Sequence, residues 1–489
     1  MRAFKELLVI WGGGLLVATP LILPGAIAEA SYKWPNYETD MLEEIYYQQV
    51  GRNGRRFGNF VATCDAGANN LGAGRTNAAE WLRLAYHDMA TGDVEIGSGG
   101  LDASISFKTE LDRPENMGSF AFTEALAIFG DFVSLHTSMA DIIALGAVMS
   151  VTACTVSEDR LPVYLPLRAG RVDASWPGPA GVPEPHQDLA TYTERFRKSG
   201  FNVSEMIALV ACGHSLGGVN GIDNPHIVPV MDDPKLAASP DLFRDTCSRL
   251  LERMIDTVPQ GVQLSRVITP ISVKPDAILM EVDGASGNMS YMTIKGDLRV
   301  RLLSFCFYIV GRDTTPGVSP SACALPQARP LSSFTVEVVD TDPASKSTTT
   351  MHDNGGPGFP IETALIPQAQ LSCTQIFFGS GYEMNLTVAV RDDAHFEQVL
   401  ATVHLPVAQP GSVWVPRFEP RVLTMNKTQA VAGTGYSLYT AFFTTRSAER
   451  ARMFAAIMSY ALTGVSTGPK GNIELPFLQW KYLRGTCPP

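Results

Sequence analysis

Two stretches of sequence decide the fold of this chain: Trp81-Leu82-Arg83-Leu84-Ala85-Tyr86-His87-Asp88 and, far downstream, Glu205-Met206-Ile207-Ala208-Leu209-Val210-Ala211-Cys212-Gly213-His214-Ser215. On a helix, Arg83 and His87 stand four residues apart, so a base and a fixed cation project from the same face. His214 ends a helical stripe that begins with Ile207 and Val210. This otherwise apolar face can offer one imidazole to a metal in an apolar slot. The two histidines suggest the two faces of one haem.

The segments around these stretches predict a mainly α-helical first half. Asn77-Ala78-Ala79-Glu80 and Asn202-Val203-Ser204-Glu205 resemble capping boxes that open the two helices, and Gly217-Gly218 would end the second. Most segments between residues 40 and 262 show helical periodicity.

After Pro259 the pattern changes to short β-branched or alternating runs separated by Gly, Pro, Asn and Ser clusters: Ala277–Val282, Leu298–Val310, Phe334–Val339, Leu386–Val390 and Val399–Leu405. This spacing predicts a β-rich, sandwich-like domain, closed by an amphipathic helix from about Ser447 to Leu462. We therefore expect a signal peptide over 1–30, the helical domain over 31–264 and the β-rich domain over 265–489. The β-rich half offers no catalytic constellation; its partner is open, and it would bind a polymer, cover the helical domain or mediate self-association.

Charge and the amino terminus indicate a secreted or cell-wall-associated protein. The 489 residues carry 38 Lys and Arg against 49 Asp and Glu, a net charge of −11 that argues against a nucleic-acid or anionic-membrane partner. Arg2 and Lys5 precede an apolar stretch from Leu7 to Ala28, which is typical of a cleaved secretory signal; an uncleaved anchor is the alternative. No second segment is long and apolar enough to span a bilayer.

The cysteines and glycosylation sequons fit the same compartment. Eight cysteines without CxxC spacing favour disulfides over a zinc or iron–sulfur site, with Cys212–Cys247 and Cys64–Cys154 as plausible pairs. Asn-x-Ser/Thr sequons begin at Asn202, Asn288, Asn385 and Asn426.

The chemistry that residues 83–104 can perform is peroxide cleavage beside a cation site. A histidine that binds no metal can take a proton from one peroxide oxygen and pass it to the other, while a permanently charged arginine stabilises the developing negative charge. The carboxylates, hydroxyl and carbonyls of Asp88 and of Gly99-Gly100-Leu101-Asp102-Ala103-Ser104 are hard oxygen ligands that suit Ca²⁺. The same stretch also suits an ordinary glycine-rich loop.

These residues resemble five ordered motifs of the plant, fungal and bacterial haem peroxidase superfamily, in particular its secreted fungal type. The resemblance covers roughly residues 40 to 262. The matching segments are the distal Arg83-Leu84-Ala85-Tyr86-His87-Asp88, the calcium motif Gly100-x-Asp102-x-Ser104, Glu110-Leu111 with Pro114-Glu115-Asn116, Arg168-Ala169-Gly170-Arg171-Val172-Asp173, and the proximal Ala208-Leu209-Val210-Ala211-x-Gly213-His214-Ser215.

The resemblance implies an enzyme that binds haem b and uses H₂O₂ to oxidise small organic reductants in one-electron steps through a ferryl intermediate. His214 would be the axial iron ligand, and Arg83 and His87 the catalytic pair. Asn116 would accept a hydrogen bond from the distal histidine, and Tyr86 would line the haem pocket. Asp88, Gly100, Asp102 and Ser104 would bind a distal Ca²⁺, and Ser215 a proximal one.

Departures from the family pattern leave the reductant open. Tyr86 stands where the family usually has Trp or Phe. The positions at which manganese-oxidising relatives have acidic ligands hold Asn77, Trp81 and Asn220. The positions at which other relatives have an electron-transferring tryptophan hold Leu209 and Val230. The segment from Pro229 to Phe243 is shorter than in relatives, which leaves Asp232, Asp233, Asp241 and Asp245 as candidates for the acid that supports the axial histidine.

Two alternatives belong to other function classes. Gly213-His214-Ser215-Leu216-Gly217 is also a G-x-S-x-G pattern, the nucleophile elbow of lipases and esterases, and it would require Met206 to Cys212 to be a strand. The helical character of residues 40–200 disfavours it. A catalytically impaired haem-binding protein of the cell surface is the second alternative.

Overall fold

The structure is a computed structural model, and it describes residues 32–49, 51, 55–61, 76–116, 118, 120–155, 163–184, 186–214, 240–271, 273–283, 291–300, 303–308, 323–326, 332–340, 348–377, 381–445, 456–468, 471–479 and 483. The predicted signal peptide, Ser215 and Cys64 lie outside these residues. Within them, no helix is long and apolar enough to cross a membrane.

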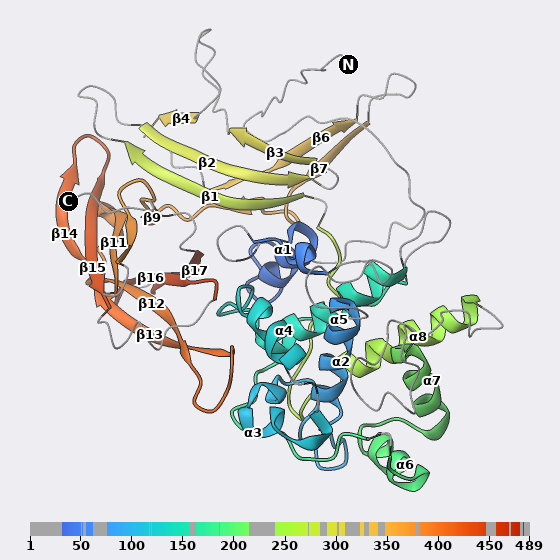
Figure 1. Ribbon diagram of the computed structural model, residues 1–489. Helices are drawn as coiled ribbons and strands as arrows, with labels where there is room; N and C mark the ends of the chain where they lie inside the picture. The colour runs from blue at the N-terminus through green and yellow to red at the C-terminus, as the bar shows by residue number, and fades with distance from the viewer. Residues whose placement is uncertain are drawn as a thin grey trace.

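The first half of the chain is helical, as the sequence predicts. Its α-helices are α1 (Asp40–Gln48), α2 (Asn77–Met89), α3 (Lys108–Leu111), α4 (Phe120–Gly130), α5 (Met139–Thr155), α6 (Leu189–Lys198), α7 (Val203–His214) and α8 (Pro240–Ile255). In Figure 1 they gather on one side of the molecule, with α2 and α5 at the centre and α6, α7 and α8 at the rim. Trp81, Phe57 and Phe129 pack ring against ring in the helical core.

The helix starts follow local capping chemistry. Asn202 and Glu205 form the predicted capping box: Asn202 Oδ1 accepts from Glu205 N at 3.0 Å, and Glu205 Oε2 accepts from Asn202 N at 3.1 Å. At α2 the cap lies one residue earlier than predicted, because Thr76 rather than Asn77 accepts from Ala79 N. Both helices thus begin on side-chain oxygens that satisfy free backbone N–H groups.

The second half is built from antiparallel sheets. Its strands are β1 (Val273–Asp283), β2 (Tyr291–Val300), β3 (Leu303–Tyr308), β4 (Cys323–Pro326), β5 (Ser333–Phe334), β6 (Val336–Asp340), β7 (Thr348–His352), β8 (Phe359–Pro360), β9 (Leu365–Pro367), β10 (Cys373–Phe377), β11 (Gly381–Arg391), β12 (Gln398–Ala408), β13 (Pro416–Thr424), β14 (Asn426–Val431), β15 (Tyr436–Thr444), β16 (Ser459–Val465) and β17 (Ile473–Gln479).

Two of these sheets form the predicted sandwich-like core. One has the order β10-β11-β15-β14 with β9 added to β11, and the other has the order β13-β12-β16-β17. Alternate residues of β12, such as Val399, Ala401 and Val403, are buried in a second hydrophobic cluster that also holds Met384 and Leu386 of β11. A further sheet, β1-β2-β3 with β4, lies over α1 in Figure 1.

The prediction of an amphipathic helix from Ser447 to Leu462 is wrong for the part of that segment that the structure describes. Residues from Ser459 belong to strand β16, whose Tyr460 and Leu462 pack in the sandwich core. The short apolar run matched both periodicities, and pairing with β12 and β17 decided it in favour of a strand.

The two halves share core residues. Val415 and Ile457, which belong to the β-rich half, are buried in the hydrophobic cluster of the helical half. Ile457 N donates to Val133 O at 2.7 Å. A boundary near residue 265 therefore divides secondary-structure types, while the packing crosses it.

Candidate active site

Helix α2 carries the predicted distal pair into the interior. His87 is only 7 % exposed, and Asp88 beside it is fully buried. Arg83 lies one turn earlier, with its guanidinium carbon 4.7 Å from the centroid of the Phe122 ring. The same ring lies 5.1 Å from the His87 ring. The i, i+4 spacing thus places a base and a cation against one aromatic wall.

Asn116 fixes the tautomer of His87. Nδ1 of His87 lies 2.7 Å from Asn116 Oδ1, and Asn116 Nδ2 donates to Glu110 O at 2.8 Å. A carbonyl oxygen can only accept, so the Asn116 amide must turn its own oxygen toward His87. Nδ1 of His87 therefore carries the hydrogen, and Nε2 keeps a lone pair that can take a proton.

Burial and charge both keep His87 neutral. Desolvation, followed by the charge of Arg83, holds the pKa of His87 well below 6.5, and the hydrogen bond to Asn116 opposes this shift. Burial also lowers the pKa of Arg83 to about 10, which leaves its guanidinium protonated at neutral pH. The pair is therefore a neutral base beside a cation.

Tyr86 packs against the same region. Its ring lies 5.8 Å from the His87 ring and 6.1 Å from the Phe196 ring. Burial raises the pKa of its phenol, so the hydroxyl stays protonated at neutral pH.

Asp88 organises the loop that follows α2. Its Oδ2 accepts from the amides of Asp102 and Ala103 at 3.0 and 2.7 Å, and its Oδ1 accepts from Ile105 N at 2.9 Å. Gly100 has a φ of +105°, and a Cβ there would meet Thr257 O at 2.6 Å, so only glycine fits this turn. The four predicted cation ligands thus lie on α2 and one tight loop.

The buried carboxyl groups of Asp88 and Asp102 would be stabilised by a nearby positive charge. Burial, and then the charge of Asp102, raise the pKa of Asp88. The Ser104 hydroxyl is buried, and within the described residues it has no hydrogen-bond partner. No group of three His, Cys, Asp or Glu side chains in the described part of the chain is arranged to hold a metal. A cation here would therefore bind through hydroxyl and backbone oxygens as well as carboxylates, a donor set that suits Ca²⁺.

Glu110 belongs to one of the matching motifs, but its own role in the site was not predicted from the sequence. Its side chain is buried, and burial raises its pKa to about 7. Its Oε2 accepts from Gly178 N at 2.5 Å, and its backbone carbonyl holds Asn116. The sequence signal for this role was that Glu110 stands six residues before Asn116. The turn between them brings the Glu110 carbonyl to the Asn116 amide.

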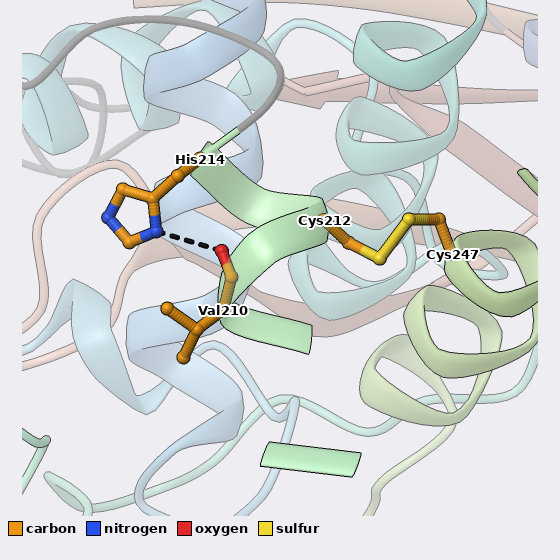
Figure 2. The surroundings of a disulfide bond; sticks show 4 residues. All are labelled: Val210, Cys212, His214 and Cys247. Carbon is orange, nitrogen blue, oxygen red and sulfur yellow. Dashed lines mark hydrogen bonds between the residues drawn. A yellow bond between two sulfur atoms is a disulfide. The ribbon is translucent and has the colours of Figure 1, made fainter. Parts of the chain in front are cut away.

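The proximal candidate, His214, ends α7. Its Nδ1 donates to Val210 O at 2.8 Å, so Nε2 carries the lone pair (Figure 2). Exposed apolar side chains on the same helix face lead toward it: Val203, Ile207 and Val210 are 47 %, 62 % and 37 % exposed. An apolar helix face that ends in a free imidazole nitrogen fits a flat, metal-bearing ligand.

The Cys212–Cys247 disulfide predicted as a plausible pair is present and joins α7 to α8. Figure 2 shows it on the opposite side of α7 from the His214 ring. Cys154 is also disulfide-bonded, while its predicted partner Cys64 lies outside the described residues. The disulfide anchors the last turn of α7, which carries His214.

A backbone carbonyl, and not the expected acidic side chain, accepts the Nδ1 hydrogen of His214. The imidazole has one Nδ1 hydrogen, and the Val210 carbonyl accepts it. Among the candidate aspartates, Asp232 and Asp233 lie outside the described residues, and Asp245 is exposed on α8.

The Arg168–Asp173 motif makes structural contacts, and Arg171 and Asp173 have different partners. Arg171 is buried and bonds Asp141 Oδ1 at 3.0 Å and Asp256 Oδ1 at 2.8 Å. Asp173 accepts from Met139 N and Ala140 N at the start of α5. These bonds tie the motif to α5 and α8.

The esterase alternative fails on secondary structure. A nucleophile elbow needs a strand before its serine, and residues 203–214 form helix α7.

Comparison with known proteins agrees with this geometry. The family model described as "Peroxidase" matches residues 65–258, the segment that holds the distal and proximal candidates. A WSC domain-containing protein of Arthroderma benhamiae is 33 % identical over 363 residues, covering 62 % of this chain and 48 % of that protein. The putative L-ascorbate peroxidase 6 and the peroxisomal L-ascorbate peroxidase 5 of Arabidopsis thaliana are 32 % and 31 % identical, covering 31 % and 33 % of this chain. The chain spans about half the length of these relatives, between 44 % and 54 %.

Proposed function

Because the chain belongs to the plant, fungal and bacterial haem peroxidase superfamily, we propose that it is a peroxidase that binds haem b between α2 and α7. These two helices contact one another. His214 Nε2 would hold the iron, and the apolar face of Val203, Ile207 and Val210 would cover the porphyrin. When bound, haem supplies two-electron reduction of hydrogen peroxide followed by two one-electron oxidations of a small organic reductant.

In this proposal His87 moves the proton. Its neutral Nε2 accepts a proton from one oxygen of H₂O₂ and returns it to the other oxygen, which leaves as water when the O–O bond breaks. The Arg83 guanidinium stabilises the negative charge that develops as the O–O bond breaks. Asn116 holds the ring so that Nε2 keeps its lone pair at the start of each cycle. Tyr86 closes the aromatic side of the pocket.

One observation carries the proposal: the neutral, buried His87, fixed through Asn116 and Glu110, lies beside a permanent cation. A structural histidine has no need of a fixed tautomer and a neighbouring positive charge. The arrangement fits acid–base catalysis on a small neutral molecule that carries two exchangeable protons.

The experiment reconstitutes the full chain with haem and records its absorption spectrum before and after H₂O₂. The wild type and His186→Ala should show a Soret band that changes with H₂O₂ and should oxidise a dye. His186 is an exposed control. His214→Ala should lose the band. Haem binding without peroxide-dependent dye oxidation would point to the impaired haem-binding alternative, and no Soret band in the wild type would refute the proposal.

We also propose a distal Ca²⁺ bound by Asp88, Gly100, Asp102 and Ser104. The repulsion between the buried carboxylates and the unpartnered Ser104 hydroxyl support it. Ca²⁺ at a hundredfold excess over Kd should stabilise the fold by about 2.7 kcal/mol. A chelator should therefore lower Tm in the wild type and in the exposed control Asp112→Asn, but not in Asp102→Asn/Ser104→Ala. Chelation without effect on wild-type Tm would exclude the ion.

We further propose that the protein acts outside the cell or at the cell wall. The Cys212–Cys247 disulfide supports an oxidising compartment, and the similarity to a WSC domain-containing protein is consistent with it. The proximal Ca²⁺ at Ser215 remains a proposal, because Ser215 lies outside the described residues. Fractionation of the source cells, followed by detection of the chain in the medium or wall, tests the location.

A further inference from the structure

We call residues 90–107, between α2 and α3, the distal loop. The turn between β12 and β13 reaches from the β-rich half onto this loop. We call residues 409–413 of this turn the strap. Lys108 N donates to Gly411 O at 2.9 Å, and Val413 N donates to Ser106 O at 2.8 Å. The hydroxyls of Ser106 and Ser412 lie 2.7 Å apart. Figure 1 shows the turn extending from the sheet toward α3. The strap therefore pairs with residues 106–108 as a short strand would.

The strap holds a second segment beside the same loop. Gln409 Nε2 donates to Ala174 O at 2.7 Å, and Ala174 N donates to Asp102 O at 2.7 Å. The strap thus contacts the distal loop directly at Ser106 and indirectly at Asp102, and it contacts the start of α3 at Lys108.

Hydrogen bonds on both sides of helix α3, joined by the backbone of that helix, lead from the strap to the distal histidine. Lys108, which bonds Gly411, begins helix α3. Glu110 on that helix presents the carbonyl that orients Asn116, and Asn116 orients His87. All of these side chains except Lys108 are buried, so an altered position of α3 has no water nearby to replace the lost bonds.

We infer that the β-rich half positions the distal histidine, with the strap fixing α3, and through Glu110 and Asn116 the Nδ1–H tautomer of His87. This inference rests on the proposed function only for its catalytic meaning, because the tautomer is set in the haem-free protein. The residues of the strap are positioning residues that touch no reacting atom. They give the β-rich half a role in the site of the helical half.

The test uses two matched glycines at turns of the same sheet. Gly411, in the strap, and Gly471, between β16 and β17, have φ values of +79° and +67°. Alanine is strained in either left-handed conformation. A Cβ at Gly411 faces Phe107 at 3.6 Å, whereas a Cβ at Gly471 meets nothing within 4 Å. Gly411→Ala therefore strains the backbone of the strap, where the new methyl group would lie in ordinary contact with Phe107, and Gly471→Ala strains only its own turn.

Two haem-free measurements on the full chain are needed. Hydrogen exchange reports on residues 106–116, and ¹⁵N NMR of the imidazole nitrogens reports on the His87 tautomer. Gly411→Ala should raise the exchange rate of residues 106–116. Val413→Pro removes the donor to Ser106 O and should raise that rate more, by about threefold to tenfold, which corresponds to the loss of one hydrogen bond. Both should also convert the single Nδ1–H tautomer into a mixture. Gly471→Ala should do neither.

Each other result overturns the inference. Unchanged exchange and tautomer in the strap variants would show that the strap does not support α3. Faster exchange with an unchanged tautomer would limit the strap to a structural role. The same changes in Gly471→Ala would reveal general loosening of the sheet. If Val413→Pro fails to fold, Gly411→Ala and Ser412→Ala decide. Failure of haem binding alone would refute the proposed function and leave these outcomes unaffected.

Discussion

The distal and proximal sides of the proposed haem site are built in opposite ways. On the distal side, His87 is buried, and its orientation depends on Asn116 and Glu110 from separate elements. On the proximal side, His214 ends an exposed apolar helix face, and its partner among the described residues is Val210 of its own helix. The bonds that orient the distal histidine thus lie within the protein, whereas the proximal side presents apolar surface that a ligand would bury.

This difference separates two physical tasks. Acid–base chemistry needs a fixed tautomer and a tuned pKa, which only a buried network provides. Cofactor capture needs accessible apolar area and a free lone pair, which a helix end provides. Variants on the distal side should therefore change rates, and variants on the proximal side should change retention and stability.

The largest expected effect follows the loss of the distal base. His87→Leu should lower the rate of reaction with H₂O₂ by about 10²–10⁴-fold, because proton transfer loses its catalyst. Haem binding should persist, since His214 is intact. Stopped-flow absorbance with the reconstituted chain measures both quantities, with His186→Leu as the exposed control. A near-normal rate would show that His87 is not the base.

Next in size is the loss of the disulfide behind His214. Cys212→Ser/Cys247→Ser opens a link between residues 35 apart and should cost about 3–4 kcal/mol of unfolding free energy. Denaturant titration measures the loss. The His87 tautomer should stay unchanged, because the distal network does not include α7. A changed tautomer would contradict the separation of the two sides.

A smaller effect is expected from Asn116→Leu. The substitution leaves the His87 Nδ1–H and the Glu110 carbonyl without their partner in a buried site, which should cost about 1–3 kcal/mol. The unfolding free energy reports the loss. Imidazole NMR should show both His87 tautomers. A single unchanged tautomer would mean that another group fixes the ring.

The smallest effect is a displacement on the pH axis. His87 must be neutral to act, so the rate falls as pH drops through its pKa, which lies below 6.5. The positive charge of Arg83 lowers that pKa, and Arg83→Leu removes this contribution. The pKa should therefore rise, and the acid limb of the pH–rate profile should move to higher pH. A profile that stays in place would place Arg83 outside electrostatic reach of His87.

Much of this could be predicted from local sequence. The i, i+4 spacing of Arg83 and His87, the capping box at Asn202 and the apolar stripe before His214 are set by neighbouring residues, and the structure shows them as predicted. The helical-then-β order was equally readable, because period 3.6 gives way to period 2 after Pro259. The helix expected near Ser447–Leu462 was wrong where described, because strand pairing outweighed a short apolar period.

The sequence by itself determined which residues are candidates for the chemistry, since residue type and helical spacing fix what a side chain can do and which face it occupies. Only the tertiary structure decided how they are held. The Glu110 carbonyl sets the Asn116 amide, the Val210 carbonyl holds His214, and the strap of the β-rich half bonds the distal loop. The physical reason is that each of these contacts uses a backbone group, and the strap contact also joins segments distant along the chain. Every residue carries the same backbone groups, so no residue pattern marks them.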